Sequence, residues 1–166
     1  MIKLVRVDHR LLHGQVIFSW TRQTAANHII VADDLVPNDP IGKMALSLAK
    51  PSGCSLDIIP FSELKQTVES NADKNIMIIV RGPKEALRLV HELPQVREIN
   101  YGGVAKKQDS KPYGKAVYLN KEELKDTQEI LSEGDQHFIY SRFPPLRLNM
   151  LIFQNSRLSR EGVILC

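Results

Sequence analysis

The stretch IKLVRVDHRLLHGQV, residues 2–16, carries the pattern that decides the fold. Ile2–Val7 is a short apolar run interrupted only by basic side chains, which predicts a β-strand. Gly14–Thr24 follows soon after, and Ile17 and Trp20 within it share one face of a helix. The stretch therefore predicts a strand that leads through a short junction into an amphipathic helix.

The same alternation recurs along the chain. Short runs rich in isoleucine and valine are separated by segments of helical spacing, which is typical of βα units and a mainly parallel sheet. We expect one α/β domain with about seven strands and helices on both faces. The expected strands are 2–7, 28–32, 54–59, 75–80, 96–101, 116–119 and 136–140. The expected helices are 14–24, one from Pro40 that Asn38 or Asp39 caps, one from Ser62 to about Asn71, 84–93 and 121–132.

The end of the chain differs from the rest. We predict that residues 1–154 form the domain, because no linker or internal repeat divides them. Residues 155–166 show no convincing periodicity and are assigned to a tail without a functional role. The polar stretch 106–115 contains Pro112 and Gly114 and is predicted to be a surface loop.

Charge and cysteine content exclude several classes of protein. The net charge of +3 comes without a dense basic run, so we expect no nucleic-acid partner. Cys54 and Cys166 are the only cysteines and form no CxxC pair, which argues against a disulfide framework or a zinc site. Charged residues interrupt the first ten positions, and no later apolar run approaches the ~20 residues of a membrane span. We therefore expect a cytoplasmic protein that does not itself span a membrane.

The junction between the first strand and the first helix carries the candidate chemistry. Ligands of open α/β sheets bind beyond the carboxyl ends of the strands, where a helix N-terminus favours anions. The imidazole of His13 is a candidate nucleophile, because a histidine with an ordinary pKa near 6.5 is largely neutral at cellular pH. Arg10 offers a planar guanidinium for phosphate oxygens, and Gly14 allows the backbone to approach them closely.

Further residues of this junction complete the predicted site. Asp8 is the candidate orienting partner of His13, since a carboxylate can bond the second nitrogen of an imidazole. Arg6, Gly14 and Gln15 are assigned to phosphate binding. We expect phosphoryl transfer without a bound metal or other cofactor, with arginine and backbone donors supplying the positive field.

Residues 6–16, RVDHRLLHGQV, closely resemble the segment around the phosphorylated histidine in the IIB components of the mannose/sorbose family of the bacterial sugar phosphotransferase system. The resemblance continues through the helix with Trp20, the IIVADD strand end at 29–34 and Asn100-Tyr101-Gly102-Gly103, and covers about positions 1 to 150. It implies that His13 accepts phosphate from a phosphohistidine on a IIA partner. It also implies transfer to a sugar that arrives through membrane-embedded IIC and IID partners.

Several alternatives remain open from the sequence. His9 and His13 are four residues apart, but no third metal ligand is evident nearby. Asp33 and Asp34 either shape the rim of the site or simply turn the chain. A patch around Leu11, Leu12 and Phe18 suits a docking surface, although Leu12 and Phe18 fit the core equally well.

Two rival functions also fit a histidine at a strand end. A histidine phosphatase would place an arginine directly before the histidine, whereas Leu12 occupies that position here. A non-catalytic binding or regulatory module would hold a phosphorylated metabolite at the same helix end without modification of His13. The sugar is not specified by the sequence.

Overall fold

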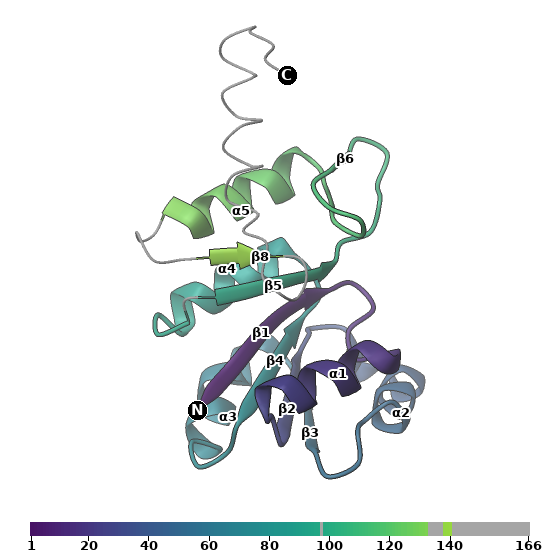
Figure 1. Cartoon of the computed structure of the whole chain (residues 1–166), viewed down its shortest axis with the longest axis vertical. Helices are drawn as coiled ribbons and strands as arrows, with labels where there is room; N and C mark the ends of the chain where they lie inside the picture. Colours follow the sequence, from purple (N-terminus) through teal and green to yellow (C-terminus); the bar gives the residue numbers. More distant parts are fainter. Residues whose placement is uncertain (97, 133–137, 141–166) are drawn as a thin grey trace, which may run out of the picture.

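A parallel sheet with helices on both faces forms the centre of the protein (Figure 1). The computed structural model describes residues 1–96, 98–132 and 138–140. Its elements are β1 (Ile2–Asp8), α1 (Gly14–Thr24), β2 (His28–Ala32), the 3-10 turn η1 (Val36–Asn38), α2 (Pro40–Leu48), β3 (Ser55–Ile59), the 3-10 turn η2 (Phe61–Glu63), α3 (Leu64–Ser70), β4 (Ile76–Val80), α4 (Pro83–Glu92), β5 (Glu98–Gly103), β6 (Lys111–Pro112), β7 (Tyr118–Leu119), α5 (Lys121–Ser132) and β8 (Phe138–Tyr140).

The main sheet has the strand order β3-β2-β4-β1-β5-β8, and all its described pairs are parallel. Every residue of β2 and β4 is buried. Because helices cover both faces of these strands, neither face contacts water, and the strands consist of continuous runs of mainly apolar residues. The predicted α/β class and the mainly parallel sheet are confirmed.

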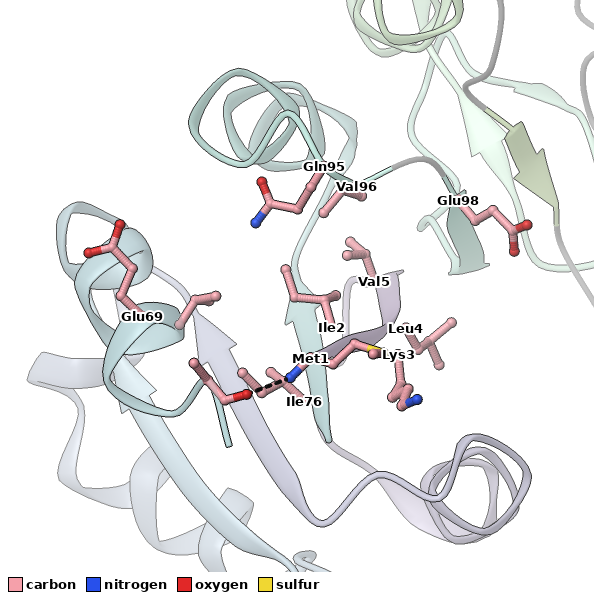
Figure 2. Close-up of a pocket in the computed structure, with 12 residues that line it drawn as sticks. Met1, Ile2, Lys3, Leu4, Val5, Glu69, Ile76, Gln95, Val96 and Glu98 are labelled. Carbon is pink, nitrogen blue, oxygen red and sulfur yellow. Dashed lines mark hydrogen bonds between the residues drawn. The ribbon is translucent and has the colours of Figure 1, made fainter. Parts of the chain in front are cut away.

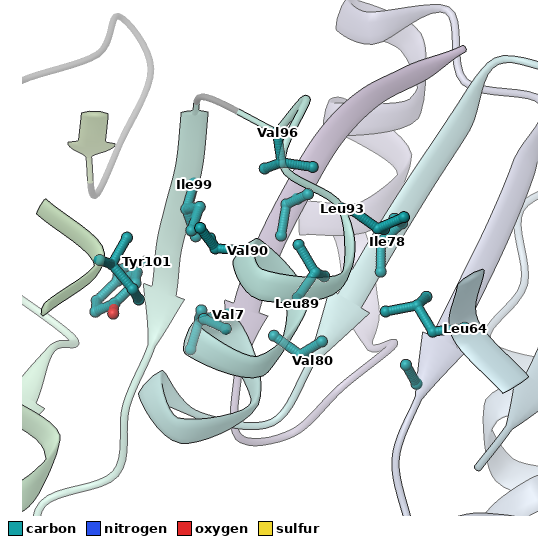
Figure 3. Close-up of a cluster of buried hydrophobic side chains, with 14 of the residues drawn as sticks. Val7, Leu64, Ile78, Val80, Leu89, Val90, Leu93, Val96, Ile99 and Tyr101 are labelled. Atoms are coloured by element: carbon teal, nitrogen blue, oxygen red, sulfur yellow. The ribbon is translucent and has the colours of Figure 1, made fainter. Parts of the chain in front are cut away.

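Two separate cores lie on the two faces of the sheet, because successive strand residues point to opposite sides. Val5 and Val7 of β1 belong to the core beneath α3, α4 and α5. Leu4 belongs to the other core, with Ile17 and Trp20 of α1. Figure 3 shows the first core, where side chains of α4 lie against those of β1 and β4. The predicted placement of helices on both faces is therefore confirmed.

The strand count is lower than predicted, because the expected strand 116–119 does not join the main sheet. Its last two residues form β7, which pairs antiparallel with β6 inside the stretch predicted as a loop. In the main sheet β8 pairs directly with β5, so the segment between these two strands in the sequence contributes no strand to it. The described sheet therefore has six strands, with a two-stranded hairpin beside it.

The remaining predicted elements match with shifts of a few residues. Asp39 is the cap of α2, and its side chain accepts a hydrogen bond from the Ile41 amide at 3.1 Å. The predicted tail at 155–166 and the first two residues of the predicted strand 136–140 lie outside the described residues. Within the described ranges, no helix combines the length and apolar character needed to cross a membrane.

Strand order places the junction after β1 at a special point of the sheet. From β1 the chain passes through α1 to β2 on one side, whereas from β5 it continues through α5 to β8 on the other. The carboxyl ends of β1 and β5 therefore lie where the connections diverge, which is the usual ligand position in open α/β sheets. The predicted site residues lie at this edge.

Candidate functional site

The loop from β1 to α1 is tightly folded. The amide of Leu11 donates to the carbonyl of Asp8 at 2.8 Å, and the amide of His9 donates to the carbonyl of Gly103 on β5 at 2.9 Å. Leu11 and Gly14 both have left-handed backbone conformations, with φ of 58° and 56°. For a leucine this conformation is disfavoured by about 1–2 kcal/mol, so the surrounding contacts must hold the loop in place.

Asp8 is the buried centre of the loop. Its side chain is fully buried, and its Oδ2 accepts a hydrogen bond from Arg6 Nη2 at 2.8 Å. Its Oδ1 accepts from the Arg10 amide at 3.2 Å and lies 3.6 Å from the Arg10 Nε. One carboxylate therefore connects an arginine below the loop with an arginine on it. A buried charge of this kind is tolerated only because it is paired on both oxygens.

His13 is the N-cap residue of α1, but its side chain makes no capping hydrogen bond. Its Nδ1 lies 3.0 Å from the carbonyl oxygen of Leu11. Since a carbonyl only accepts, Nδ1 carries the hydrogen and donates it, and the lone pair of a neutral ring is then on Nε2. Nε2 is buried and has no hydrogen-bond partner among the described residues. The ring must therefore turn before either nitrogen can meet a phosphorus atom.

The expected hydrogen bond between Asp8 and His13 is not formed. Asp8 Oδ1 and His13 Nδ1 are 3.9 Å apart, which is beyond hydrogen-bond range. The left-handed turn at Leu11 brings its carbonyl to the ring instead. In this geometry the Leu11 carbonyl orients the ring, while Asp8 acts on it through space.

The surface of the site is positive and partly open. The side chains of Arg10, His9 and His13 are 54%, 40% and 24% exposed. A Cβ added to Gly14 would meet no atom within 4 Å outside its chain neighbours, so the backbone at the start of α1 is uncovered there. The first turn of α1 contains no acidic residue, so its amide groups and helix dipole are not offset there. This arrangement favours an anion beside His13.

Arg6 is buried beneath the loop and does not reach the surface. It is 4% exposed, and its Nη1 donates to the side-chain oxygen of Asn100 on β5. Gly102 provides the room, because a Cβ there would lie 2.0 Å from the Arg6 guanidinium carbon. Gly102 and Gly103 belong to β5 and have no left-handed backbone, so they serve close packing against β1 rather than the tight turn considered from the sequence.

Arg81 was not predicted as a site residue, although it directly follows β4. Its Nε donates to Asp33 Oδ2 at 2.6 Å, and its Nη1 donates to the carbonyl of His9 at 3.2 Å. Asp33 also accepts from the amides of Leu35 and Val36, so it both turns the chain and holds Arg81. Burial raises the pKa of Asp33, but hydrogen bonds from Arg81 and these two amides outweigh it, and the pKa is lowered.

One signal in the sequence could have identified Arg81. A basic residue directly after a buried parallel strand lies at the same sheet edge as the carboxyl end of β1.

Asp34, the neighbour of Asp33, is exposed and pairs with Arg88 at 3.0 Å, away from the loop. Gln15 begins the helix with Gly14, but its side chain lies outside the described part of the structure.

Leu11 and Leu12 are each 2% exposed and belong to the core under α1, so the docking patch considered around them is wrong. Phe18 on α1 is 40% exposed.

Among the described residues, no group of three or more histidine, cysteine, aspartate or glutamate side chains could hold a metal ion.

A cavity of about 660 Å³ lies at the opposite end of the sheet (Figure 2). It is lined by Met1 and the first residues of β1, with Glu69 of α3, Ile76 of β4 and Glu98 of β5. These are the amino ends of the strands, whereas the loop with His13 follows the carboxyl end of β1. This cavity is therefore separate from the candidate site.

Known proteins share both the sequence pattern and the fold of this chain. The family described as PTS system sorbose subfamily IIB component matches residues 2–141. A probable phosphotransferase enzyme IIB component of Streptococcus pyogenes serotype M6 is 34% identical over 139 residues, which cover 80% of this chain and 85% of that protein. The mannose-specific EIIAB component of Escherichia coli K12 is 27% identical over 136 residues, 81% of this chain but only 42% of that longer protein.

A solved structure shows the same architecture. The crystal structure of the IIBSor domain of the sorbose permease from Klebsiella pneumoniae superimposes with a TM-score of 0.83 at 26% identity, covering 94% of this chain and 97% of that one. Fold and sequence thus agree over most of the described residues, and the chain belongs to the PTS system sorbose subfamily IIB component family, whose members are phosphocarriers in sugar uptake.

Proposed function

We propose that His13 is the residue that carries the phosphoryl group, and that the chain acts as a protein-histidine phosphotransferase between a IIA donor and a sugar. The observation that carries this proposal is a partly exposed imidazole at the uncapped start of α1, with uncovered backbone at Gly14 and the exposed guanidinium of Arg10 nearby. These groups supply a nucleophile and a positive field in one place.

The reaction takes place in two transfers. Once the ring of His13 has turned, one of its nitrogens attacks the phosphorus of a phosphohistidine on the donor, so that one N–P bond forms while the donor's N–P bond breaks. In the second transfer, a sugar hydroxyl attacks the same phosphorus, an O–P bond forms, and the nitrogen of His13 leaves with its electron pair. The hydroxyl proton passes to a base at the permease or to solvent.

Each neighbouring residue has a distinct part in the proposal. Arg10 and the first amides of α1, including those at Gly14 and Gln15, meet the phosphate oxygens and offset a charge of nearly two negative units. Arg6 contributes from beneath by fixing Asp8, whose Oδ1 in turn holds the Arg10 amide. Asp8 also favours the positive charge that the ring bears when it is bonded to phosphorus.

The proposed partners are a IIA phosphodonor, a IIC/IID permease in the membrane and the sugar it delivers, and the chain itself would act in the cytoplasm. The word EIIAB in the name of the Escherichia coli relative supports a IIA donor, because there the two parts share one protein. The sorbose-specific name of the Klebsiella pneumoniae relative supports a sugar acceptor, without naming the sugar for this chain.

The test is to incubate the protein with the general phosphocarrier proteins, the IIA protein of the same organism and labelled phosphoenolpyruvate. Alkaline mass spectrometry, under which phosphohistidine survives, should place the label on His13, and His13→Ala should take up none. His9→Ala is the matched control and should still be labelled, since its Nδ1 is 4.0 Å from Asp8 and its ring lies off the start of α1. Equal labelling of wild type and His13→Ala would disprove the proposal.

A further inference from the structure

A short hairpin formed by β6 and β7 stands between β5 and α5 (Figure 1). It contains the stretch that the sequence predicts as a polar surface loop, and the chemistry proposed for His13 makes no use of it. We call residues 104–119 the lysine hairpin, because four of its exposed side chains are lysines: Lys106, Lys107, Lys111 and Lys115.

The backbone of the lysine hairpin is fixed. At its base the Val104 amide donates to the Ala116 carbonyl at 2.9 Å, and the Tyr118 amide donates to the Val104 carbonyl at 3.2 Å. Further out, the Tyr113 amide donates to the Val117 carbonyl at 2.9 Å. The side chain of Tyr113 is buried in the core beneath α3, α4 and α5. The lysines therefore project from a rigid support, which keeps their charges in one region.

The base of the lysine hairpin adjoins the loop that carries His13. Gly103 directly precedes the hairpin, and its carbonyl accepts the His9 amide at 2.9 Å. Because β5 is parallel to β1, the hairpin and the β1–α1 loop both leave the sheet at its carboxyl edge (Figure 1). The charges of the hairpin therefore act on the side of the molecule from which His13 is approached.

Positive charge exceeds negative charge on the lysine hairpin. Lys107 is paired with Glu123 of α5 at 2.7 Å, so these two charges largely cancel. The other three lysines form no ion pair with a described acidic side chain, and Asp109 is the single acidic residue of the hairpin. Three lysines against one aspartate leave the hairpin with a net charge of +2.

The charges nearest to the hairpin do not reverse this sign. At the start of α5, the exposed Lys121 and Glu122 have opposite charges. On the β1–α1 loop, the exposed Arg10 adds a positive charge, whereas Asp8 is buried and paired. The positive excess therefore extends from the hairpin to the loop with His13.

Exposed aspartates also occur at the carboxyl edge, but they lie farther along the sheet. Asp34 and Asp39 belong to the connection after β2, and Asp34 is paired with Arg88. In the strand order, β4 and β1 lie between β2 and β5, which puts about 14 Å of sheet between that connection and the hairpin. This separation exceeds the Debye length of about 8 Å at physiological ionic strength. These aspartates therefore leave the field of the hairpin largely unchanged.

A phosphorylated donor brings negative charge to this edge whatever the rest of its surface, because its phosphohistidine carries nearly two negative charges. Lysine is a mobile, hydrated point charge and does not fix phosphate oxygens as an arginine fork does. No large apolar side chain of the hairpin is exposed, so the hairpin offers charge rather than area for a stable interface. Such a surface suits attraction over distance, which raises association rates by about 10- to 1,000-fold.

From these observations we infer that the lysine hairpin steers the phosphodonor, a protein that carries an anionic phosphohistidine, toward His13. The inference rests on the proposed function of His13 and deepens it by assigning the approach of the donor. The hairpin acts before the transfer, by raising the rate at which the donor and His13 meet. It takes no part in the bonds that form and break.

The experiment measures kcat/KM for transfer from the phosphorylated IIA protein of the same organism at a series of salt concentrations. The triple variant Lys106→Gln/Lys111→Gln/Lys115→Gln should lower kcat/KM about tenfold at about 10 mM salt. The difference should vanish near about 1 M salt, where the Debye length is ~3 Å, and the rate at saturating donor should not change. Equal kcat/KM of the triple variant and wild type at low salt would overturn the inference, and so would a loss that persists at high salt.

Two control variants test the position and the sign of the charge. Lys3→Gln/Lys65→Gln/Lys74→Gln removes the same charge from the amino ends of β1 and β4 and from α3, and should retain the kcat/KM of wild type. An equal loss in both triple variants would show that only net charge matters and would overturn the inference. Asp109→Asn makes the hairpin more positive and should raise kcat/KM at low salt, whereas a fall would contradict steering.

Other results separate the two proposals. Wild-type protein that takes up no label from the IIA protein at any salt concentration would refute the function of His13. Labelling of His13 with equal kcat/KM in wild type and the hairpin triple variant would refute only the steering. Cosedimentation with vesicles of phosphatidylcholine and phosphatidylglycerol tests a lipid surface instead. Vesicle binding that the hairpin triple variant loses, with an unaltered kcat/KM, would assign the hairpin to the membrane and overturn the inference.

Discussion

Replacement of Gly102 by alanine tests whether the buried arginine beneath the loop is fixed as the structure describes. The new Cβ would lie 2.0 Å from both the guanidinium carbon and Nη2 of Arg6, and 2.3 Å from its Nη1. Real contacts to a Cβ are well over 3 Å, so small shifts cannot accommodate the methyl group. The guanidinium must move away from Asp8 and Asn100, to which it donates hydrogen bonds.

The magnitude follows from what this movement breaks. Separating a buried ion pair costs about 3–5 kcal/mol, because it leaves an uncompensated charge. We therefore expect Gly102→Ala to lower the free energy of unfolding by about 3–5 kcal/mol, a large share of the ~5–15 kcal/mol typical of a domain. For a chain of this length the midpoint of thermal unfolding should fall by about 10 °C or more.

Urea denaturation followed by circular dichroism measures this change, and Gly82→Ala is the matched control. A Cβ at Gly82 would meet only the flexible end of Glu85 at 3.0 Å, and the backbone there is extended. Its substitution should lower stability by less than about 1 kcal/mol. A loss of less than 1 kcal/mol in Gly102→Ala as well would refute the reasoning.

A double-mutant cycle isolates the cause. If the methyl group acts by displacing Arg6, then Gly102→Ala should have a much smaller effect in an Arg6→Ala background, because the guanidinium is already gone. Additive losses would show that the substitution disturbs β5 itself. The same variants should lose phosphoryl transfer to His13, since Asp8 would no longer hold the Arg10 amide in place.

Three further predictions concern the loop and the opposite end of β2. Arg81→Ala should slow phosphoryl transfer to His13 about tenfold at saturating donor, because the His9 carbonyl loses its hydrogen bond from Arg81. Arg81→Lys keeps the charge but cannot bind Asp33 and the His9 carbonyl at the same time, so it should recover only part of the rate. A wild-type rate in Arg81→Ala would contradict this role. Gly14→Ala should lower the free energy of unfolding by about 1–2 kcal/mol in urea titrations, because φ at this position is 56°. The added methyl group meets no atom within 4 Å outside its chain neighbours, so the cost comes from the backbone conformation alone. An unchanged urea midpoint would show that the loop relaxes. Burial lowers the pKa of His28 in the folded protein, although Asp57 acts to raise it. The stability that neutral His28 contributes is therefore complete above the ordinary histidine pKa and is lost as the pH falls toward the pKa of the folded state. Urea midpoints from pH 7.5 to 5 should fall less in His28→Gln than in wild type, and parallel curves would contradict this.

The local pattern of the chain determined most of its secondary structure. Helical spacing of apolar residues marks α1, and a short continuous run of apolar residues marks β2, so the bounds of both could be read from the sequence without knowing what packs on them. The junction with Asp8, Arg10 and His13 was found in the same way, because a strand followed at once by a helix places its loop at the carboxyl edge of the sheet.

Only the tertiary structure decided which distant residues complete that junction. Arg81 reaches the His9 carbonyl and Gly102 makes room for Arg6 because β4 and β5 both lie beside β1, an order that no local period encodes. The apolar outer face of α2 shows the same limit: the sequence predicts an apolar helix, but only the packing shows which of its apolar sides the protein leaves in water. Periodicity reports how each segment is divided into faces, whereas strand order and packing decide what each face meets.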